Sequence, residues 1–141
     1  MQKYEYQAQY YETDQMGIIH HSNYIRWMES ARIWFMEQMG IDYGRMEQQG
    51  IISPVLEVSC EYRSMVHFGD RVLIMVEIEK YNGVRLDLSY RITDKISGEV
   101  RTTGRSKHCF LDREGKPVSL RKSCPEFDKA FVGYLESGNE M

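Results

Sequence analysis

Residues 22–39, SNYIRWMESARIWFMEQM, form the longest helical pattern in the chain. At about 100° per residue, the large apolar side chains of this stretch fall within an arc of roughly 200°. These side chains are Tyr24, Trp27, Met28, Ala31, Trp34, Phe35, Met36 and Met39. Ser22 or Asn23 is expected to cap the helix, and Gly40 is expected to end it. Because the arc is wider than one-sided packing requires, the pattern predicts a helix that other elements wrap.

Alternating apolar and polar residues predict strands before and after this helix. One strand is expected over residues 3–11, and four more over about 56–62, 72–78, 84–92 and 99–111, with a hairpin turn at Asn82-Gly83. Several of these runs approach or exceed about ten residues, which is long enough for a sheet to curl. The element order predicts the α+β class, with a five-stranded antiparallel sheet wrapped around one long central helix.

Length and composition indicate one folded domain. The 141 residues are 42% hydrophobic, so we expect a single domain over residues 1–141, with a short helix at 125–135 and a frayed tail at 136–141. The net charge of -3 leaves no basic surface for nucleic acid, and no apolar run approaches the roughly 18 residues of a membrane span. Cys60, Cys109 and Cys124 are too widely spaced for a disulfide framework, which favours a reducing, cytoplasmic setting.

An acid and a histidine, Asp14 and His21, lie seven residues apart across an irregular segment that ends where the helix begins. Backbone N–H groups at a helix N-terminus favour a developing oxyanion, and a nearby carboxylate can act as a nucleophile or general base. Gly17 permits a positive φ or a close approach to a ligand. The pattern therefore suits carbonyl chemistry. The alternative is that Asp14 only stabilises the turn and the histidines are merely exposed.

The run from Tyr10 to Arg32 resembles the opening of the hotdog-fold acyl-CoA thioesterases, specifically the 4-hydroxybenzoyl-CoA thioesterase and YbgC-like group. The matching residues are Asp14, Gly17, His21, Asn23-Tyr24 and Met28-Glu29-Ser30-Ala31-Arg32. Residues 62–70 and 110–117 resemble later elements of that family, so the likeness reaches about residue 125. Met65 and Arg121 stand where the family commonly has proline, which bears on turn geometry. The resemblance implies the hotdog fold and the hydrolysis of acyl-CoA thioesters.

The resemblance also assigns roles to residues of the first segment. Asp14 matches the catalytic carboxylate, and His21 matches a histidine of the YbgC-like branch. The thioester carbonyl is then expected near the N–H groups of His21 and Ser22, with Gly17 and Tyr24 also at the substrate. Asp14 would attack the thioester carbon or activate a water, and coenzyme A thiolate would leave. His21 could orient the carboxylate or water and transfer a proton.

Further charged residues have both a functional and a structural interpretation. Arg101, Arg105 and Lys107 share one face of the last strand and could hold the phosphates of coenzyme A, or could simply be solvated. Glu29 and Arg32, three residues apart, are expected to form a surface or interface ion pair. His20 and His21 lack the spacing that places two histidines on one helix face, so no metal is expected. No cofactor is expected beyond the coenzyme A of the substrate.

Two other functions remain open from the sequence. One is a hydratase or dehydratase of acyl thioesters on the same fold, and the other is an acyl-CoA-binding module without turnover. In the family that the chain resembles, two protomers join their sheets and the site lies between them. We therefore expect a homodimer or a homotetramer built from two dimers, with no nucleic-acid partner.

Overall fold

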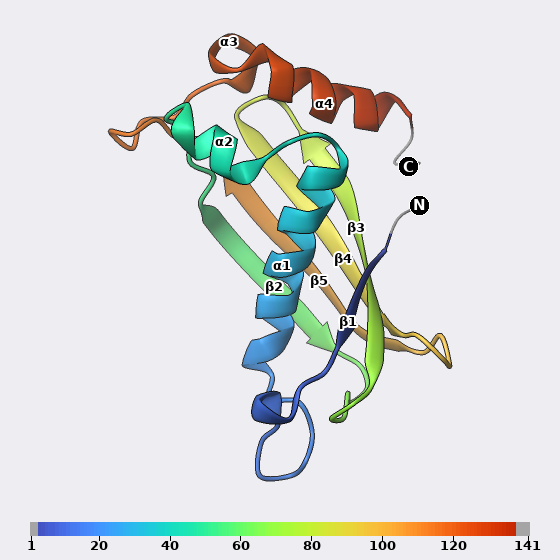
Figure 1. Ribbon diagram of the computed structural model, residues 1–141. Coiled ribbons are helices and arrows are strands. Elements are labelled where there is room, and N and C mark those ends of the chain that lie inside the picture. Colours follow the sequence, from blue (N-terminus) through green and yellow to red (C-terminus); the bar gives the residue numbers. More distant parts are fainter. Residues whose placement is uncertain (1–2, 138–141) are drawn as a thin grey trace.

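The computed structural model describes residues 3–137, and these form one curved antiparallel sheet with helices on its concave side and at one end (Figure 1). The strands are β1 (Tyr4–Gln7), β2 (Val55–Tyr62), β3 (Arg71–Tyr81), β4 (Arg85–Asp94) and β5 (Val100–Cys109). Their order in the five-stranded sheet is β1-β3-β4-β5-β2, and every neighbouring pair is antiparallel. The strand order leaves β1 and β2 at the two edges.

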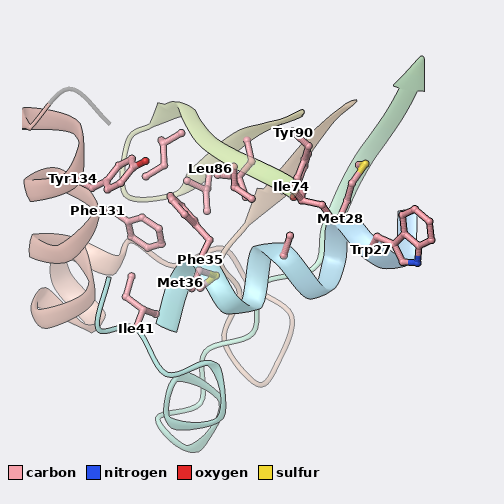
Figure 2. Close-up of a cluster of buried hydrophobic side chains, with 14 of the residues drawn as sticks. Trp27, Met28, Phe35, Met36, Ile41, Ile74, Leu86, Tyr90, Phe131 and Tyr134 are labelled. Carbon is pink, nitrogen blue, oxygen red and sulfur yellow. The ribbon is translucent and has the colours of Figure 1, made fainter. Parts of the chain in front are cut away.

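Helix α1 (Ser22–Gln38) lies along the concave face of this sheet (Figure 1). The inward rows of β3 and β4 are buried because apolar residues alternate along both strands. Figure 2 shows Trp27, Met28 and Phe35 of the helix among Ile74, Leu86 and Tyr90 of the sheet. This packing confirms the predicted α+β class, with the five-stranded antiparallel sheet wrapped around one central helix.

Strand β5 approaches α1 most closely at Gly104. A Cβ at this position would lie 2.8 Å from Met28 Sδ and 2.9 Å from the carbonyl oxygen of Ser59 on β2. Met28 is only 2% exposed, and its sulfur also accepts a hydrogen bond from Cys60 Sγ at 3.6 Å. The missing side chain of Gly104 therefore provides the space into which the helix packs.

Two boundaries near the N-terminus differ from the prediction. Strand β1 ends at Gln7 rather than at residue 11, because Tyr10–Glu12 turn into a 3-10 helix, η1. The side chain of Glu12 draws this turn together by accepting a hydrogen bond from the Gln9 N–H at 2.8 Å. Helix α1 begins at Ser22, and its N-cap residue is His21, whose own side chain makes no cap hydrogen bond. The expected cap at Ser22 or Asn23 is therefore wrong.

The segment between α1 and β2 contains a helix that the sequence analysis missed. Helix α2 (Tyr43–Gln48) follows Asp42, whose carboxylate accepts hydrogen bonds from the N–H groups of Gly44 and Arg45. The other missed helix is α3 (Leu120–Ser123). The predicted C-terminal helix is confirmed as α4 (Pro125–Glu136), which lies across one end of the sheet (Figure 1).

Helix α4 is held to the sheet by aromatic packing. Phe131 stacks on Tyr81 with 4.7 Å between ring centroids, and Tyr134 meets Phe35 of α1 edge to face at 5.0 Å. Glu136 belongs to this helix, so the predicted fraying does not begin at residue 136, and residues 138–141 of that expected tail lie outside the described residues. No helix within residues 3–137 is long and apolar enough to cross a membrane.

Candidate active site

The segment between β1 and α1 folds into a small hairpin that carries Asp14 at its turn. The N–H of His20 donates to the carbonyl of Glu12, and the N–H of Asp14 donates to the carbonyl of Ile18, both at 2.9 Å. The turn is closed by the N–H of Gly17, which donates to the Asp14 carbonyl at 3.1 Å. Gly17 has φ of +79°, a conformation that favours glycine. The hairpin thus returns the chain to α1 within a few residues of Asp14.

The turn also fixes the carboxylate of Asp14. Its Oδ1 accepts a hydrogen bond from the Met16 N–H at 2.8 Å. This side-chain turn is typical of aspartate at the start of a tight turn. No hydrogen bond within residues 3–137 engages Oδ2, so one oxygen of the carboxylate holds the loop while the other stays available.

Glu12 anchors the base of the hairpin. Its carboxylate is buried and accepts hydrogen bonds from Tyr6 Oη at 3.0 Å and from Trp27 Nε1 at 2.8 Å. Burial, followed by the hydrogen bond to Glu12, raises the pKa of Tyr6 well above its ordinary value. These contacts tie the hairpin to β1 and α1. The sequence analysis missed Glu12. The available signal was an acid that follows a strand with two tyrosines and precedes a helix that contains a tryptophan.

The two histidines meet the first residue of α1 in different ways. His20 Nδ1 lies 2.9 Å from Ser22 Oγ and accepts a hydrogen bond from the Ser22 N–H at 3.2 Å. The ring of His21 stacks on that of His20, with centroids 4.2 Å apart. The N–H of His21 has no hydrogen-bond partner within residues 3–137. Of the two amides expected near a substrate carbonyl, that of Ser22 is therefore engaged and that of His21 is open.

A pocket of about 440 Å³ brings Asp14 and His21 together. Tyr24 and Tyr62 line it with a ring-centroid separation of 5.2 Å. Burial raises the pKa of Tyr24, whose hydroxyl accepts a hydrogen bond from the Val66 N–H at 3.3 Å. Tyr62 Oη in turn donates to the His21 carbonyl at 3.2 Å. Among the expected site residues, Asp14, His21 and Tyr24 line this pocket, whereas Gly17 and Ser22 shape it from outside.

The three cations of β5 do not act as one row. Arg101 is engaged by Asp94 at 3.4 Å and by Ser64 Oγ at 3.1 Å, and Lys107 lies 3.8 Å from Glu57. Arg105 makes no ion pair within residues 3–137 and lines a groove of about 600 Å³ on the convex face of the sheet.

This convex groove adjoins the Asp14 pocket through Arg63, which lines both. Ser59, Ser89 and Thr103 also line the groove, as does Glu61, whose carboxylate accepts a hydrogen bond from Arg63 at 2.9 Å. The groove walls therefore combine hydroxyl groups with two guanidinium groups and one carboxylate. Hydroxyl and guanidinium donors of this kind suit phosphate oxygens. Arg63 is the residue that the sequence analysis did not select, because its place between the two hollows depends on the curl of the sheet.

A second histidine cluster lies inside the fold. Ser106 Oγ is 2.7 Å from both Tyr90 Oη and His108 Nε2, and the serine and histidine are 4% and 1% exposed. Burial, followed by the charge of Arg32, lowers the pKa of His108 to about 4. The expected ion pair of Arg32 with Glu29 is present, with Glu29 48% exposed and Arg32 only 2% exposed. The i, i+3 spacing could not reveal the burial of the arginine, whose guanidinium lies 5.5 Å from the ring centroid of Tyr43 on α2.

No group of three histidine, cysteine or acidic side chains able to hold a metal ion occurs within the described part of the chain. The pocket itself is lined by a carboxylate, an imidazole and two tyrosine rings, and the N–H of His21 has no hydrogen-bond partner within the described residues. These groups suit nucleophilic or general-base attack on an acyl carbon, with the carbonyl oxygen hydrogen-bonded to an N–H.

Known proteins share this arrangement of elements. A family model described as the thioesterase-like superfamily matches residues 9–131. YneP of Bacillus subtilis (strain 168), provisionally named an acyl-CoA thioesterase, is 36% identical over 130 residues, which cover 92% of this chain and 94% of that protein.

Solved structures agree with these sequence matches. The crystal structure of a DHNA-CoA thioesterase from Staphylococcus aureus has a TM-score of 0.91 at 33% identity and covers 99% of this chain and 95% of that chain. A 1,4-dihydroxy-2-naphthoyl-CoA thioesterase from Synechocystis has a TM-score of 0.83 at 19% identity, covers 92% of this chain and 94% of that chain, and so supports the fold alone. The superpositions confirm the expected hotdog fold.

Proposed function

The chain belongs to the thioesterase-like superfamily, and we propose that it hydrolyses acyl-CoA thioesters to the free acid and coenzyme A. One observation carries the proposal: Asp14 and His21 line one pocket, and the His21 N–H has no hydrogen-bond partner within residues 3–137. A carboxylate and an unengaged N–H are the two groups that attack on a thioester requires.

The reaction begins with the thioester carbonyl oxygen accepting a hydrogen bond from the His21 N–H. In the nucleophilic route, Asp14 Oδ2 attacks the carbonyl carbon, the C–S bond breaks, and water then hydrolyses the resulting anhydride. In the general-base route, a water molecule gives its proton to Asp14 as its oxygen attacks, and the thiolate leaves. The His21 imidazole orients the carboxylate or the water in either route. Gly17 and Ser22 support the loop, and Tyr24 packs against the acyl group.

Coenzyme A is proposed to extend from the pocket into the convex groove. Arg63 lines both hollows and Arg105 lies in the groove, so the two guanidinium groups can meet successive phosphates. Arg101 and Lys107 pair with Asp94 and Glu57 and do not line the groove, so the proposal gives them a supporting part, in which they adjust the charge along the same strand face. Arg63 pairs with Glu61, and in the proposal it exchanges this exposed carboxylate for a phosphate. Arg105→Ala should raise KM for acyl-CoA with little change in kcat, because it removes binding remote from the reacting bond.

A second copy of the chain is proposed to pair along β2. This edge strand exposes apolar residues, including Val55 at 46%, Leu56 at 47% and Tyr62 at 49%. An exposed apolar edge favours association with another strand. We therefore propose a homodimer, or a homotetramer of two dimers, with Tyr62 placing the pocket beside the interface. Sedimentation that shows only a 16.7 kDa species at micromolar concentration would contradict this assembly.

The proposed setting is cytoplasmic. Cys60, Cys109 and Cys124 are all free thiols in the structure, which supports a reducing compartment. Fractionation of cells that express the intact chain tests this placement, because recovery with secreted proteins would contradict it.

A thiol-release assay tests the activity directly. The protein is incubated with a panel of aliphatic and aromatic acyl-CoA thioesters, and the freed thiol is titrated. Asp14→Asn should abolish release, because asparagine keeps the Oδ1 acceptor for Met16 but is neither a base nor a nucleophile. Asp112→Asn is the matched control, since Asp112 holds a similar turn through the Glu114 and Lys116 N–H groups, away from the pocket.

The same panel separates the proposal from its alternatives. If wild-type protein releases no thiol from any thioester, or if Asp14→Asn releases it as fast, the catalytic proposal fails. Loss of the double bond of an enoyl-CoA without thiol release would indicate a hydratase. Saturable binding without any conversion would indicate a binding module.

A further inference from the structure

The imidazole ring of His20 accepts a hydrogen bond from the backbone N–H of Ser22, the first residue of α1. Its Nδ1 accepts a hydrogen bond from the Ser22 N–H at 3.2 Å and lies 2.9 Å from Ser22 Oγ. Helix α1 has no other side-chain cap, because its N-cap residue His21 makes no such hydrogen bond. The imidazole of His20 therefore accepts a backbone hydrogen bond of the kind that an asparagine or serine side chain accepts at many helix starts.

This contact determines the tautomer of His20. A nitrogen that accepts a hydrogen bond from an N–H must carry a lone pair, so the proton of the neutral ring lies on Nε2. The Ser22 hydroxyl can donate to the same nitrogen. Protonation of the ring would place a hydrogen on Nδ1 and turn the acceptor into a donor that faces another N–H. The hydrogen bond from the Ser22 N–H therefore requires a neutral ring, whereas the 2.9 Å contact with Ser22 Oγ fits either direction of donation.

Two further contacts make the placement of His20 specific. Its backbone N–H closes the hairpin by donating to the Glu12 carbonyl at 2.9 Å, and its ring stacks on His21 with centroids 4.2 Å apart. The backbone is thus held to the hairpin and the ring to the helix. A shift of the His20 ring would move both the His21 ring and the short turn that presents the His21 amide.

We propose that His20 is a positioning residue of the reaction: it withdraws the Ser22 amide from the pocket and leaves the His21 amide as the donor to the thioester carbonyl. The inference rests on the proposed thioesterase function. With His20 in place, one amide at the helix start is engaged and its neighbour is open. Without it, two amides and the Ser22 hydroxyl compete for one carbonyl oxygen, and residues 20–22 lose their anchor.

The titratable groups around His20 are few. His21 stacks on it, Asp14 lies at the turn of the same hairpin, and Glu12 contributes its carbonyl while its carboxylate is bound by Tyr6 and Trp27. His20→Asn and His20→Leu both keep His21 and Asp14 and both remove the ring that stacks on His21. A difference in pH profile between these two variants therefore reports on the contact with the Ser22 N–H.

Two substitutions separate positioning from folding. Asparagine places an amide oxygen close to the position of Nδ1, so His20→Asn should keep the contact with the Ser22 N–H. Leucine has no acceptor, so His20→Leu should lose it. We expect His20→Leu to lower kcat about 10- to 100-fold with little change in KM, and His20→Asn to stay within about threefold of wild type. His67→Leu removes another exposed histidine and serves as control.

Protonation provides a further readout. Imidazole groups ordinarily change charge between about pH 5 and 8, and asparagine does not. The activity of His20→Asn should fall less steeply on the acidic side than that of wild type, because its cap survives at low pH. Equal steepness in the two proteins would contradict the inference.

Nitrogen chemical shifts of the imidazole rings test the geometry without any substrate. At neutral pH the His20 ring should show the tautomer with its proton on Nε2. A proton on Nδ1 would overturn the inference, as would a folded His20→Leu protein with wild-type kcat or a folded His20→Asn protein as impaired as His20→Leu. If Asp14→Asn is fully active, the proposed function fails, whereas the ring shifts still decide whether His20 caps the helix.

Discussion

The histidine at the start of α1 and the histidine beside Arg32 in the middle of that helix have similar neighbours in opposite surroundings. At the pocket, His21 is exposed and Asp14 keeps one carboxylate oxygen free of hydrogen bonds within residues 3–137. Inside the fold, Ser106 and His108 make a 2.7 Å contact that resembles an activated serine, yet both are almost fully buried. Access to substrate, rather than the identity of the side chains, separates the reactive cluster from the structural one.

The buried cluster also shows what burial costs. His108 Nδ1 and Arg32 Nη1 have no hydrogen-bond partner in the described chain. Unpaired buried polar atoms oppose folding, and the low pKa of about 4 keeps His108 neutral at physiological pH. A serine beside a neutral histidine is the arrangement of a nucleophile and its base, but Ser106 and His108 line neither the Asp14 pocket nor the convex groove. We therefore assign it to the stability of the fold.

The largest effect should come from the exposed cluster. Asp14→Asn is expected to lower kcat by about 10²- to 10⁴-fold, the range for removal of a general base. Its free energy of unfolding should stay close to that of wild type, because the Met16 N–H keeps its acceptor. Kinetics and urea denaturation on the same preparation check both expectations. A stability loss that accounts for the inactivity would place Asp14 with the structural groups.

The next effect is a pH dependence of stability that originates at His108. Its pKa is about 4 in the folded chain, whereas a histidine in an unfolded chain has a pKa of about 6.5. The unfolded chain therefore binds more protons between these values, and the free energy of unfolding should fall as the pH drops from about 6.5 to 4. The total loss is roughly 3 kcal/mol, and His108 adds no dependence above that window.

Urea denaturation at fixed protein concentration across this pH range measures the slope. His108→Gln should flatten the curve, because glutamine has no proton to take up in this range. An unchanged curve in the His108 variant would show that the buried ring does not carry the proton uptake.

A smaller stability effect is expected at Ser106. Ser106→Ala leaves Tyr90 Oη and His108 Nε2 without their shared partner, at a cost of about 1–3 kcal/mol. The kcat of the folded protein should remain within about twofold of wild type, since the hydroxyl takes no part in the reaction. Ser106→Ala should therefore lower stability and keep kcat, whereas Asp14→Asn should keep stability and lower kcat. A large fall in kcat for a stably folded Ser106→Ala protein would break the distinction between the two clusters.

The smallest effect should occur where the pocket meets the sheet edge. Tyr62→Phe removes the hydroxyl that donates to the His21 carbonyl at 3.2 Å. Tyr62 is half exposed, so about 1 kcal/mol is at stake, which corresponds to a change of about fivefold in kcat/KM. Tyr24→Phe is the comparison, because its buried hydroxyl serves the Val66 N–H instead. If kcat/KM is unaltered in Tyr62→Phe, the Tyr62 hydroxyl on β2 does not position the turn that contains His21.

Local patterns predicted most of the fold. The alternation of Val72, Ile74 and Val76 requires one buried strand face, and the wide apolar arc of residues 22–39 requires a wrapped helix. Helix α2 was missed because its six residues are too few for a clear period, although the Asp42 cap was readable. The end of β1 depends on the carboxylate of Glu12, which reaches Trp27 across the fold.

The residues of the candidate site could be predicted from the sequence, but the hydrogen bonds of their individual atoms could not. Asp14 and His21 could be placed near a helix start because the segment between them is short. The sequence could not indicate that the Ser22 amide is engaged, since that depends on the direction of the His20 ring. The sequence also could not predict that Arg63 lines both the Asp14 pocket and the convex groove, because the curvature of the sheet brings these two hollows side by side.

Gly104 restricts how the protein can change during evolution. Any side chain at this position would displace Met28 or press on the Ser59 carbonyl, and Met28 lies on the same helix that begins at the His21 turn. A substitution at Gly104 is expected to alter the pocket through α1, although Gly104 does not line the pocket. Substitution at position 104 is thus limited by the packing of α1 against β5, so glycine should persist there even in relatives that act on other substrates.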